Sequence, residues 1–95
     1  MTGQPLLDEQ AQPRLAPHVR LTFDQRREQW MVLAPERLLI PDEIALEVLQ
    51  RCDGRTSIAA MIDAFAATFD AGRDEIAADV LALIRDLISK GVLVP

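Results

Sequence analysis

Strict alternation of apolar and polar residues first appears at Val19. Val19, Leu21 and Phe23 alternate with polar residues in the run VRLTFD, and this period of two is typical of a half-buried strand. A polar run, DQRREQ, follows, and then the apolar run WMVL at residues 30–33, which is rich in the large side chains that strands favour. The pattern therefore predicts a β-hairpin.

A third strand is predicted over residues 37–40 (RLLI), between Pro35 and Pro41. Proline cannot donate a hydrogen bond to a sheet, so these prolines favour a place at the sheet edge. Arg37 is the only charged residue of this strand. An apolar edge is a template for another chain. Either a local element covers it or a peptide adds to it, and the sequence leaves both readings open.

The rest of the chain has the 3.6-residue period of helices. Asp42 is placed to cap a first helix, EIALEVLQRC, and Gly54 suits a left-handed turn after it. Ser57 is placed to cap a second helix, whose apolar positions are Ile58, Met61, Ile62, Phe65 and Phe69. The first helix has its own stripe of Ile44, Val48, Leu49 and Cys52.

A third helix is predicted from about residue 73 to residue 89, with acidic residues in its first turn. It carries two apolar stripes: Ile76, Val80, Leu83, Ile84 and Leu87, and beside them Ala77, Leu81 and Ile88. A helix on the surface of a domain needs only one. The sheet, a second copy of the chain or a bound partner must cover the surplus.

These elements predict an α+β fold of the winged helix-turn-helix type, with a three-stranded antiparallel sheet followed by three helices. Residues 1–17 contain three prolines and no sustained apolar period, so we expect a flexible N-terminal tail and a domain over residues 18–95. We expect the terminal VLVP to pack back on this domain.

The charge pattern argues against nucleic-acid binding. The chain has a formal net charge of −5, whereas a phosphate-binding surface needs clustered Lys and Arg. In a winged helix-turn-helix protein the second helix of the motif reads base edges, and SIAAMIDAFAATF offers no Arg, Lys, Asn or Gln. No apolar run is long enough to cross a membrane, and no signal-peptide pattern is present. We expect a cytoplasmic protein.

The inventory of reactive residues predicts no enzyme, no cofactor and no metal site. His18 is the only histidine, Cys52 the only cysteine, and Ser57 and Ser89 are the only serines. Ser57 is explained as a helix cap, so no nucleophile and base can be paired with confidence. The four glycines are too dispersed for a phosphate-binding loop. The lone thiol is most simply a small buried apolar group.

The order of these motifs resembles the PqqD family of pyrroloquinoline quinone (PQQ) biosynthesis, a class of RiPP recognition element. The resemblance covers about residues 19–94. The matching residues are Pro35-Glu36, the turn Asp53-Gly54 followed by Thr56 or Ser57 and Ile58, Asp79-Val80 with Leu83 and Leu87, and the terminal Lys90-Gly91-Val92-Leu93. One departure is Pro41-Asp42, where the family often has Leu-Asn. Asp also caps a helix, and we expect Pro41 to shorten the edge strand.

The resemblance implies a chaperone without chemistry of its own, which binds the precursor peptide PqqA and presents it to the radical S-adenosylmethionine enzyme PqqE. In such proteins the peptide adds beside the third strand, in a groove against the third helix. The implied site here is a pairing strand of Arg37, Leu38, Leu39 and Ile40, and a groove lined by Val80, Leu83, Ile84 and Leu87.

Other readings remain open at this point. The chain could be an acidic winged-helix regulatory module, or an oligomerisation module without a peptide ligand. The hairpin turn at residues 24–28 and the tail before His18 are candidates for contact with the enzyme. The edge strand, the third helix and the N-terminal segment could also pair with a second copy, which would make a homodimer.

Overall fold

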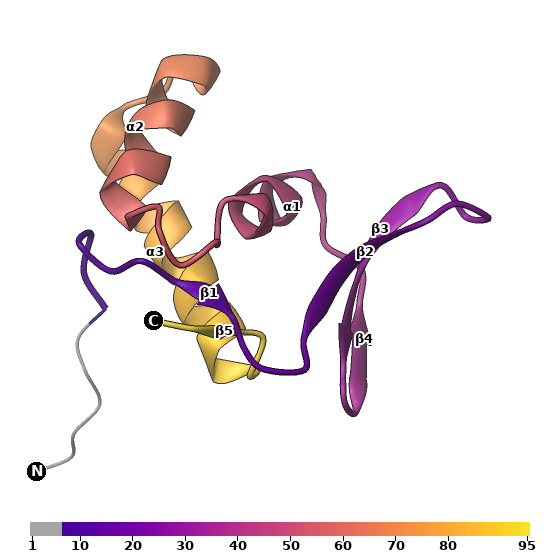
Figure 1. Ribbon diagram of the computed structural model, residues 1–95. Helices are drawn as coiled ribbons and strands as arrows, with labels where there is room; N and C mark the ends of the chain where they lie inside the picture. The colour runs from indigo at the N-terminus through magenta and orange to yellow at the C-terminus, as the bar shows by residue number, and fades with distance from the viewer. Residues whose placement is uncertain (1–6) are drawn as a thin grey trace, which may run out of the picture.

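The structure is a computed structural model that describes residues 7–95 (Figure 1). These residues form five strands and three helices. In chain order they are β1 (Arg14–Leu15), β2 (Arg20–Asp24), β3 (Gln29–Ala34), β4 (Arg37–Leu39), α1 (Glu43–Gln50), α2 (Ile58–Phe69), α3 (Arg73–Ser89) and β5 (Leu93–Val94). The α+β class, the three-stranded sheet and the three helices that follow it are therefore confirmed.

The main sheet is antiparallel, in the order β2-β3-β4. Leu21 lies opposite Val32, and Val32 lies opposite Leu39. Directly opposed residues share one face of a sheet, so these three side chains share the inner face. Val32 is 1% exposed, and Leu21 and Leu39 pack against the core. β4 is an edge strand, as its flanking prolines predicted.

The opposite face of the sheet is partly apolar and open. Leu33 lies opposite Leu38 on this face, and Leu38 is 51% exposed.

At the hairpin end of the inner face, Phe23 and Trp30 form an edge-to-face aromatic pair with ring centroids 5.5 Å apart. Phe23 is half-exposed, so alternation predicted its face correctly but not its burial.

Side-chain caps begin the first two helices where the sequence predicted. An Oδ1 atom of Asp42 accepts a hydrogen bond from the Ala45 N–H at 2.8 Å, and the Ser57 hydroxyl accepts one from the Ala60 N–H at 3.1 Å. Such caps satisfy N–H groups that have no partner inside the helix. α2 ends at Asp70, which has a left-handed backbone with φ of 49°.

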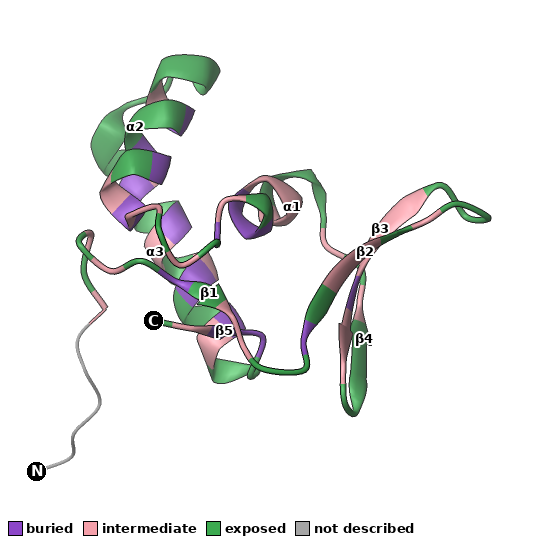
Figure 2. Cartoon of the chain, viewed as in Figure 1, coloured by how far each residue is buried: buried purple, intermediate pink, exposed green. Residues whose placement is uncertain are grey.

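The core lies among the helices and the C-terminal strand, as the buried residues in Figure 2 show. α2 contributes Ile58, Met61, Ile62 and Phe65, and the segment after α3 contributes Val92 and Leu93. The terminal segment therefore packs back on the domain, as expected. Both apolar stripes of α3 contact this core, through buried residues such as Ala77 and Ile84 and through half-buried ones such as Leu81. Much of the surplus apolar surface of α3 is thus covered by the chain itself.

The segment before β2 is more ordered than the sequence predicted. We call residues 7–16 the N-terminal clasp, because they run along the helical body and pair with it. The N–H groups of Ile58 and Ala59 donate to the carbonyl groups of Ala11 and Glu9 at 3.0 and 2.8 Å, and Pro13 is fully buried. The expected tail of residues 1–17 therefore differs from the structure over residues 7–17, while residues 1–6 lie outside the described part.

The clasp is joined to the helical body by a strand pair and an ion-pair cluster. β1 pairs with β5, Arg14 lying opposite Val94, which local periodicity did not predict. The Arg73 guanidinium contacts carboxylate oxygens of Glu9 at 2.6 Å and Asp63 at 2.7 Å. The hydrogen bond to Glu9, and then that to Asp63, raises the pKa of Arg73. The start of α3, the middle of α2 and the clasp thus meet at one side chain.

The sheet projects from the helical body on one side, and the N-terminal clasp and the C-terminus lie on the other (Figure 1). The chain enters the sheet just after residues 16–18 and leaves it through residues 40–42. Val19 and Val32 connect the sheet to the core, because both side chains are buried in it and are 8% and 1% exposed. This arrangement leaves β4 at the side of the molecule, below the start of α1 in the figure.

Candidate functional site

The free edge of β4 is the first feature of the site. Among residues 7–95, β4 pairs only with β3, and in an antiparallel strand alternate residues direct their N–H and C=O groups away from the partner strand. Leu38 and Ile40 are 51% and 58% exposed, and Arg37 is also exposed. The edge is therefore open to a further strand and has apolar side chains beside it.

Arg37 joins this edge to the far end of α3. Its Nη1 donates to the Lys90 carbonyl oxygen at 3.5 Å. The structure thus brings the first residue of the expected pairing strand to the last turn of the third helix. Leu39 differs from its neighbours, because its side chain packs against the core.

The expected groove residues on α3 lie mainly in the core. Val80, Ile84 and Leu87 are 4%, 0% and 6% exposed, and Leu83 is half-buried. The structure therefore does not gather all four into an open groove beside β4. Two apolar stripes run along this helix, and periodicity alone could not decide which of them faces the core.

A cavity between the three helices is the second feature, and we call it the three-helix pocket. Its volume is about 320 Å³, and it is lined by Ile44, Glu47, Phe65, Phe69, Ile76, Asp79 and Val80. Val80 is the one expected site residue that takes part. Sequence reasoning placed Ile44 and Phe69 in the apolar stripes of their helices, yet they are 51% and 49% exposed. Their places at a helix start and a helix end were the only signal of this.

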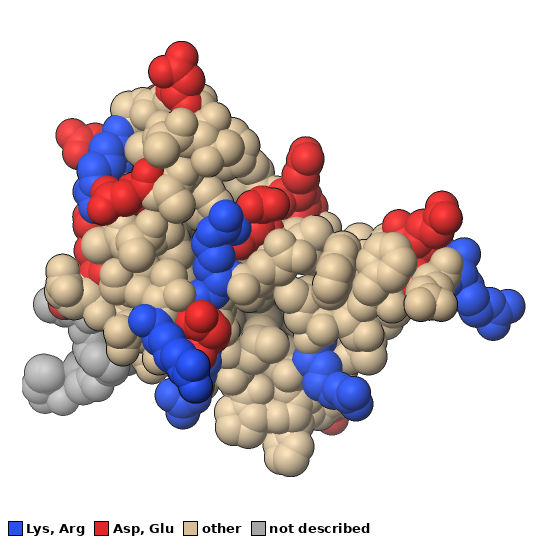
Figure 3. Space-filling model, turned by 45° about the horizontal axis from the view of Figure 1, so that its top comes forward, with Lys and Arg blue, Asp and Glu red and all other residues tan. Residues whose placement is uncertain are grey.

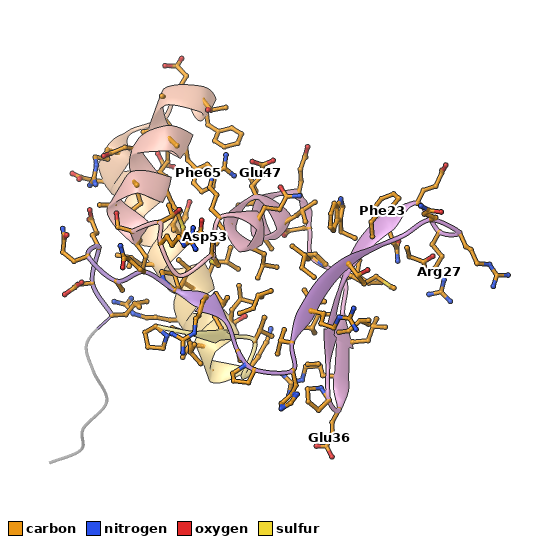
Figure 4. The ribbon with its side chains drawn as sticks, viewed as in Figure 1. Phe23, Arg27, Glu36, Glu47, Asp53 and Phe65 are labelled. Carbon is orange, nitrogen blue, oxygen red and sulfur yellow. The ribbon has the colours of Figure 1, made fainter. Side chains whose placement is uncertain are left out.

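Two residues of the pocket lining, Glu47 and Phe65, both contact Arg51. The Arg51 guanidinium lies 2.8 Å from a carboxylate oxygen of Glu47, and its Cζ is 4.8 Å from the centroid of the Phe65 ring. Figure 4 shows Glu47 on α1 and Phe65 on α2 facing the space between these helices. The Phe65 and Phe69 rings are 5.9 Å apart. This part of the lining therefore combines the apolar rings of Phe65 and Phe69 with the charge of Glu47.

The turn between α1 and α2 is built from two neighbouring residues with different roles. An Oδ1 atom of Asp53 accepts hydrogen bonds from the N–H groups of Arg55 and Thr56, each at 2.8 Å, and these bonds lower the pKa of Asp53. Burial raises the pKa of the Cys52 thiol to about 12, and the thiol donates to the Val48 carbonyl oxygen. Cys52 is thus a buried apolar group, as expected.

Residues 7–95 were also considered as metal ligands and as membrane spans. No three His, Cys, Asp or Glu side chains in this range are grouped as ligands of a metal ion. None of the helices in this range is long and apolar enough to cross a membrane.

Comparison with known proteins identifies the family. The family described as coenzyme PQQ synthesis protein D (PqqD) matches residues 29–93. A protein named "PqqA binding protein" from Rhodopseudomonas palustris is 52% identical over 92% of this chain and 85% of its own length. One of the same name from Bradyrhizobium diazoefficiens is 47% identical over 92% of this chain and 84% of its own length.

Two solved structures have the same fold. One is the solution structure of the PqqD part of PqqCD from Methylobacterium extorquens, described as a stand-alone RiPP recognition element. It is 38% identical, with a TM-score of 0.71 over 87% of this chain and 88% of the other. The other is the crystal structure of PqqD from Xanthomonas campestris, 44% identical, with a TM-score of 0.54 over 90% of this chain and 94% of the other.

The three-stranded sheet, the three helices and these likenesses define the class as a RiPP recognition element. Within that class, the chain belongs to the PqqD family of PQQ biosynthesis.

Proposed function

We propose that this protein is a peptide chaperone of PQQ biosynthesis, which binds the precursor peptide PqqA by strand addition at the free edge of β4. The observation that carries the proposal is the open edge itself, with Leu38 and Ile40 more than half exposed beside it. Relatives that are 52% and 47% identical are named PqqA binding proteins. Arg37, Leu38, Leu39 and Ile40 form the proposed pairing strand.

The energetics of strand addition are adequate for reversible binding. About four main-chain hydrogen bonds contribute ~0.5–1.5 kcal/mol each, and cross-strand contacts with Leu38 and Ile40 add ~0.2–1 kcal/mol each. Ordering a flexible peptide costs ~2–5 kcal/mol. The sum is small, so micromolar affinity needs further apolar side chains of the peptide to be buried.

α3 has a supporting role in this proposal. Leu83 is half-buried and offers contact area, whereas Ile84 and Leu87 hold the helix from the core side. Val80 reaches the three-helix pocket. The groove we propose is thus bounded by β4 and by the outer side of α3, with the buried residues fixing the helix in place.

The proposal extends to the biosynthetic context. The loaded chaperone presents the peptide to the radical S-adenosylmethionine enzyme PqqE in the cytoplasm and supplies no catalytic group. In the hairpin turn at residues 24–28, residues 25–28 are exposed, and the turn projects from the sheet on the side away from the helices (Figure 1). It is a candidate contact for that enzyme.

The test is an amide NMR titration of this chain with the precursor peptide encoded by the same organism, followed by hydrogen exchange of the complex. We expect saturable shifts at residues 37–40, and new exchange protection of the β4 amides that point away from β3. Amides inside α2 serve as the internal control, because they are already bonded within the helix.

Salt dependence separates this function from the regulatory alternative. Strand addition depends weakly on salt, whereas affinity for DNA falls steeply with it. Saturable shifts centred away from β4 would overturn strand addition at this edge. Absence of any shift at excess peptide, together with salt-sensitive binding of duplex DNA, would favour a winged-helix regulator.

A further inference from the structure

The three-helix pocket is not used by strand addition at β4. Its volume of about 320 Å³ lies at the small end of ligand pockets and suits one large side chain. Ile44 and Phe69 leave about half of their surface in water at its mouth. Exposed residues of this size in a concave site are typical of a binding surface.

The pocket is also acidic at its rim. Glu47 and Asp79 line it, on α1 and α3. Each has an acidic neighbour four residues earlier, Glu43 and Glu75 respectively. Residues at this spacing share a helix face, and like charges there destabilise a helix. Glu43 and Glu75 lie in the first turns of their helices, where the helix dipole favours acids, so the acids that distinguish the pocket are Glu47 and Asp79.

Arg51 offsets only part of this negative charge, since within residues 7–95 it forms an ion pair with Glu47 alone. Among residues 7–95, no ion pair is formed by Asp79. Figure 3 shows acidic side chains gathered between the helical body and the sheet, with a basic side chain beside them. Residues 41–95 carry ten acidic and five basic residues, whereas residues 18–40 carry three and four. The pocket therefore favours a ligand group with a positive charge.

The pocket is continuous with the edge strand. β4 leads through residues 40–42 directly into α1 (Figure 1). Large exposed apolar side chains mark this path: Leu38 on the edge strand, Ile40 just after it, Ile44 in the first turn of α1, and Phe69 at the end of α2. Ile44, which lines the pocket, follows the end of β4 at Leu39 by only five residues.

We propose that the three-helix pocket is a second subsite for the precursor peptide, which takes one bulky apolar side chain with a Lys or Arg beside it. The inference rests on the proposed function. The apolar side chain fills the space between Ile44, Phe69 and Val80, and the neighbouring cation lies against Glu47 and Asp79. The pocket thereby selects which peptide is bound, while the edge strand accepts main chain of any sequence.

The main test compares Phe69→Ala with Phe23→Ala in titrations with the precursor peptide encoded by the same organism. The two phenylalanines are matched: they are 49% and 43% exposed, and each is paired with one other aromatic ring. We expect Phe69→Ala to weaken binding about tenfold or more and Phe23→Ala to leave it unchanged. Ile44→Ala is a second pocket variant, in case Phe69→Ala lowers stability.

The charge is tested by Asp79→Asn against Glu28→Gln, which removes an acid in the hairpin turn. We expect the pocket variant to weaken binding severalfold at low salt and the hairpin variant to have no effect. Peptides with a single Ala at each large apolar position complete the test. One position should lose its effect in the Phe69→Ala protein, because the two changes remove the same contact.

The outcomes separate the two proposals. Normal peptide binding with equal affinity for Phe69→Ala, Ile44→Ala and Phe23→Ala overturns the subsite and leaves the proposed function intact. No peptide binding by the unaltered protein overturns both. Unchanged peptide affinity with loss of binding to the partner enzyme assigns the pocket to that enzyme and overturns the peptide subsite.

Discussion

Arg37, on the edge strand, donates a hydrogen bond to the carbonyl group of Lys90, at the end of the third helix, over a distance of 3.5 Å. The two residues are 53 positions apart in the chain. Within residues 7–95, no other side-chain hydrogen bond joins the three-stranded sheet to the helical body, so this contact couples the free edge to α3. A substitution at Arg37 should therefore alter the surroundings of Lys90.

We therefore predict that Arg37→Ala shifts the amide NMR signals of residues 88–91 as well as those of β4. The bond is long and exposed, so its loss should change the free energy of unfolding by about 0.5 kcal/mol or less. Urea denaturation measures this. A much larger loss would mean that Arg37 holds the sheet on the helices, and shifts confined to β4 would mean that the contact is not formed in solution.

The N-terminal clasp should be essential for stability. A chain that starts at Pro17 lacks the partners of the Ile58 and Ala59 N–H groups and the strand that pairs with β5. Each lost hydrogen bond contributes ~0.5–1.5 kcal/mol net, and the loss of Pro13 and Leu15 uncovers apolar surface of the core, so we expect a large fall in the thermal unfolding midpoint. A chain that starts at Leu7 keeps every described contact and is the control. Equal midpoints for the two chains would contradict the clasp.

Asp70→Gly should stabilise the protein. Asp70 ends α2 with φ of 49° and ψ of 45°, a left-handed backbone that costs energy for a residue with a Cβ. We expect a gain of ~0.5–1 kcal/mol in the free energy of unfolding, measured with urea. Asp74→Gly, inside α3, is the control and should lower stability, because glycine disfavours a helix. A loss with Asp70→Gly would indicate a different end to α2 in solution.

Asp53 should contribute to acid sensitivity. Hydrogen bonds from the Arg55 and Thr56 N–H groups lower its pKa from the model-compound value of 3.8. A carboxylate with a lowered folded pKa adds stability that is full above its unfolded pKa and is lost as the pH falls through the folded pKa. Stability should thus fall below about pH 4, and less steeply in Asp53→Asn, whose amide oxygen can accept the same bonds. Equal slopes would exclude Asp53 as a cause.

Cys52 should be unreactive in the folded protein. Its pKa is raised to about 12, so less than about one thiol in a thousand is ionised at pH 8, and its side chain is 5% exposed. We expect slow reaction with a thiol-specific dye at pH 8, and fast reaction in denaturing urea. Glutathione under the same conditions is the control. Fast labelling without denaturant would show that the turn after α1 opens readily.

The sequence predicted best what neighbouring residues decide. Asp42 and Ser57 cap their helices through hydrogen bonds to residues three positions later, so the signal is entirely local. Pro35 and Pro41 placed the third strand at the edge for the same kind of reason. These elements follow from propensity and capping without knowledge of the rest of the chain.

The clasp and the pocket could not be predicted in this way. The clasp is held by bonds between residues more than forty positions apart, such as Ala11 and Ile58, and its own sequence has no strand or helix period. Ile44 and Phe69 fall on the same apolar stripes as core residues, and only the packing of three helices shows that they line an open cavity. Likewise, the pattern of α3 could not separate core positions from exposed ones.

The pairing of β1 with β5 also affects how this domain can be joined to another polypeptide. Its first and last strands lie side by side, Leu15 opposite Leu93, and the C-terminus points away from the sheet (Figure 1). A domain whose two ends emerge together at one surface can be joined to another polypeptide at either end, or inserted into a loop of it, with little distortion. Such a fusion would leave the edge of β4 unobstructed, so the domain is suited to work as a transferable module.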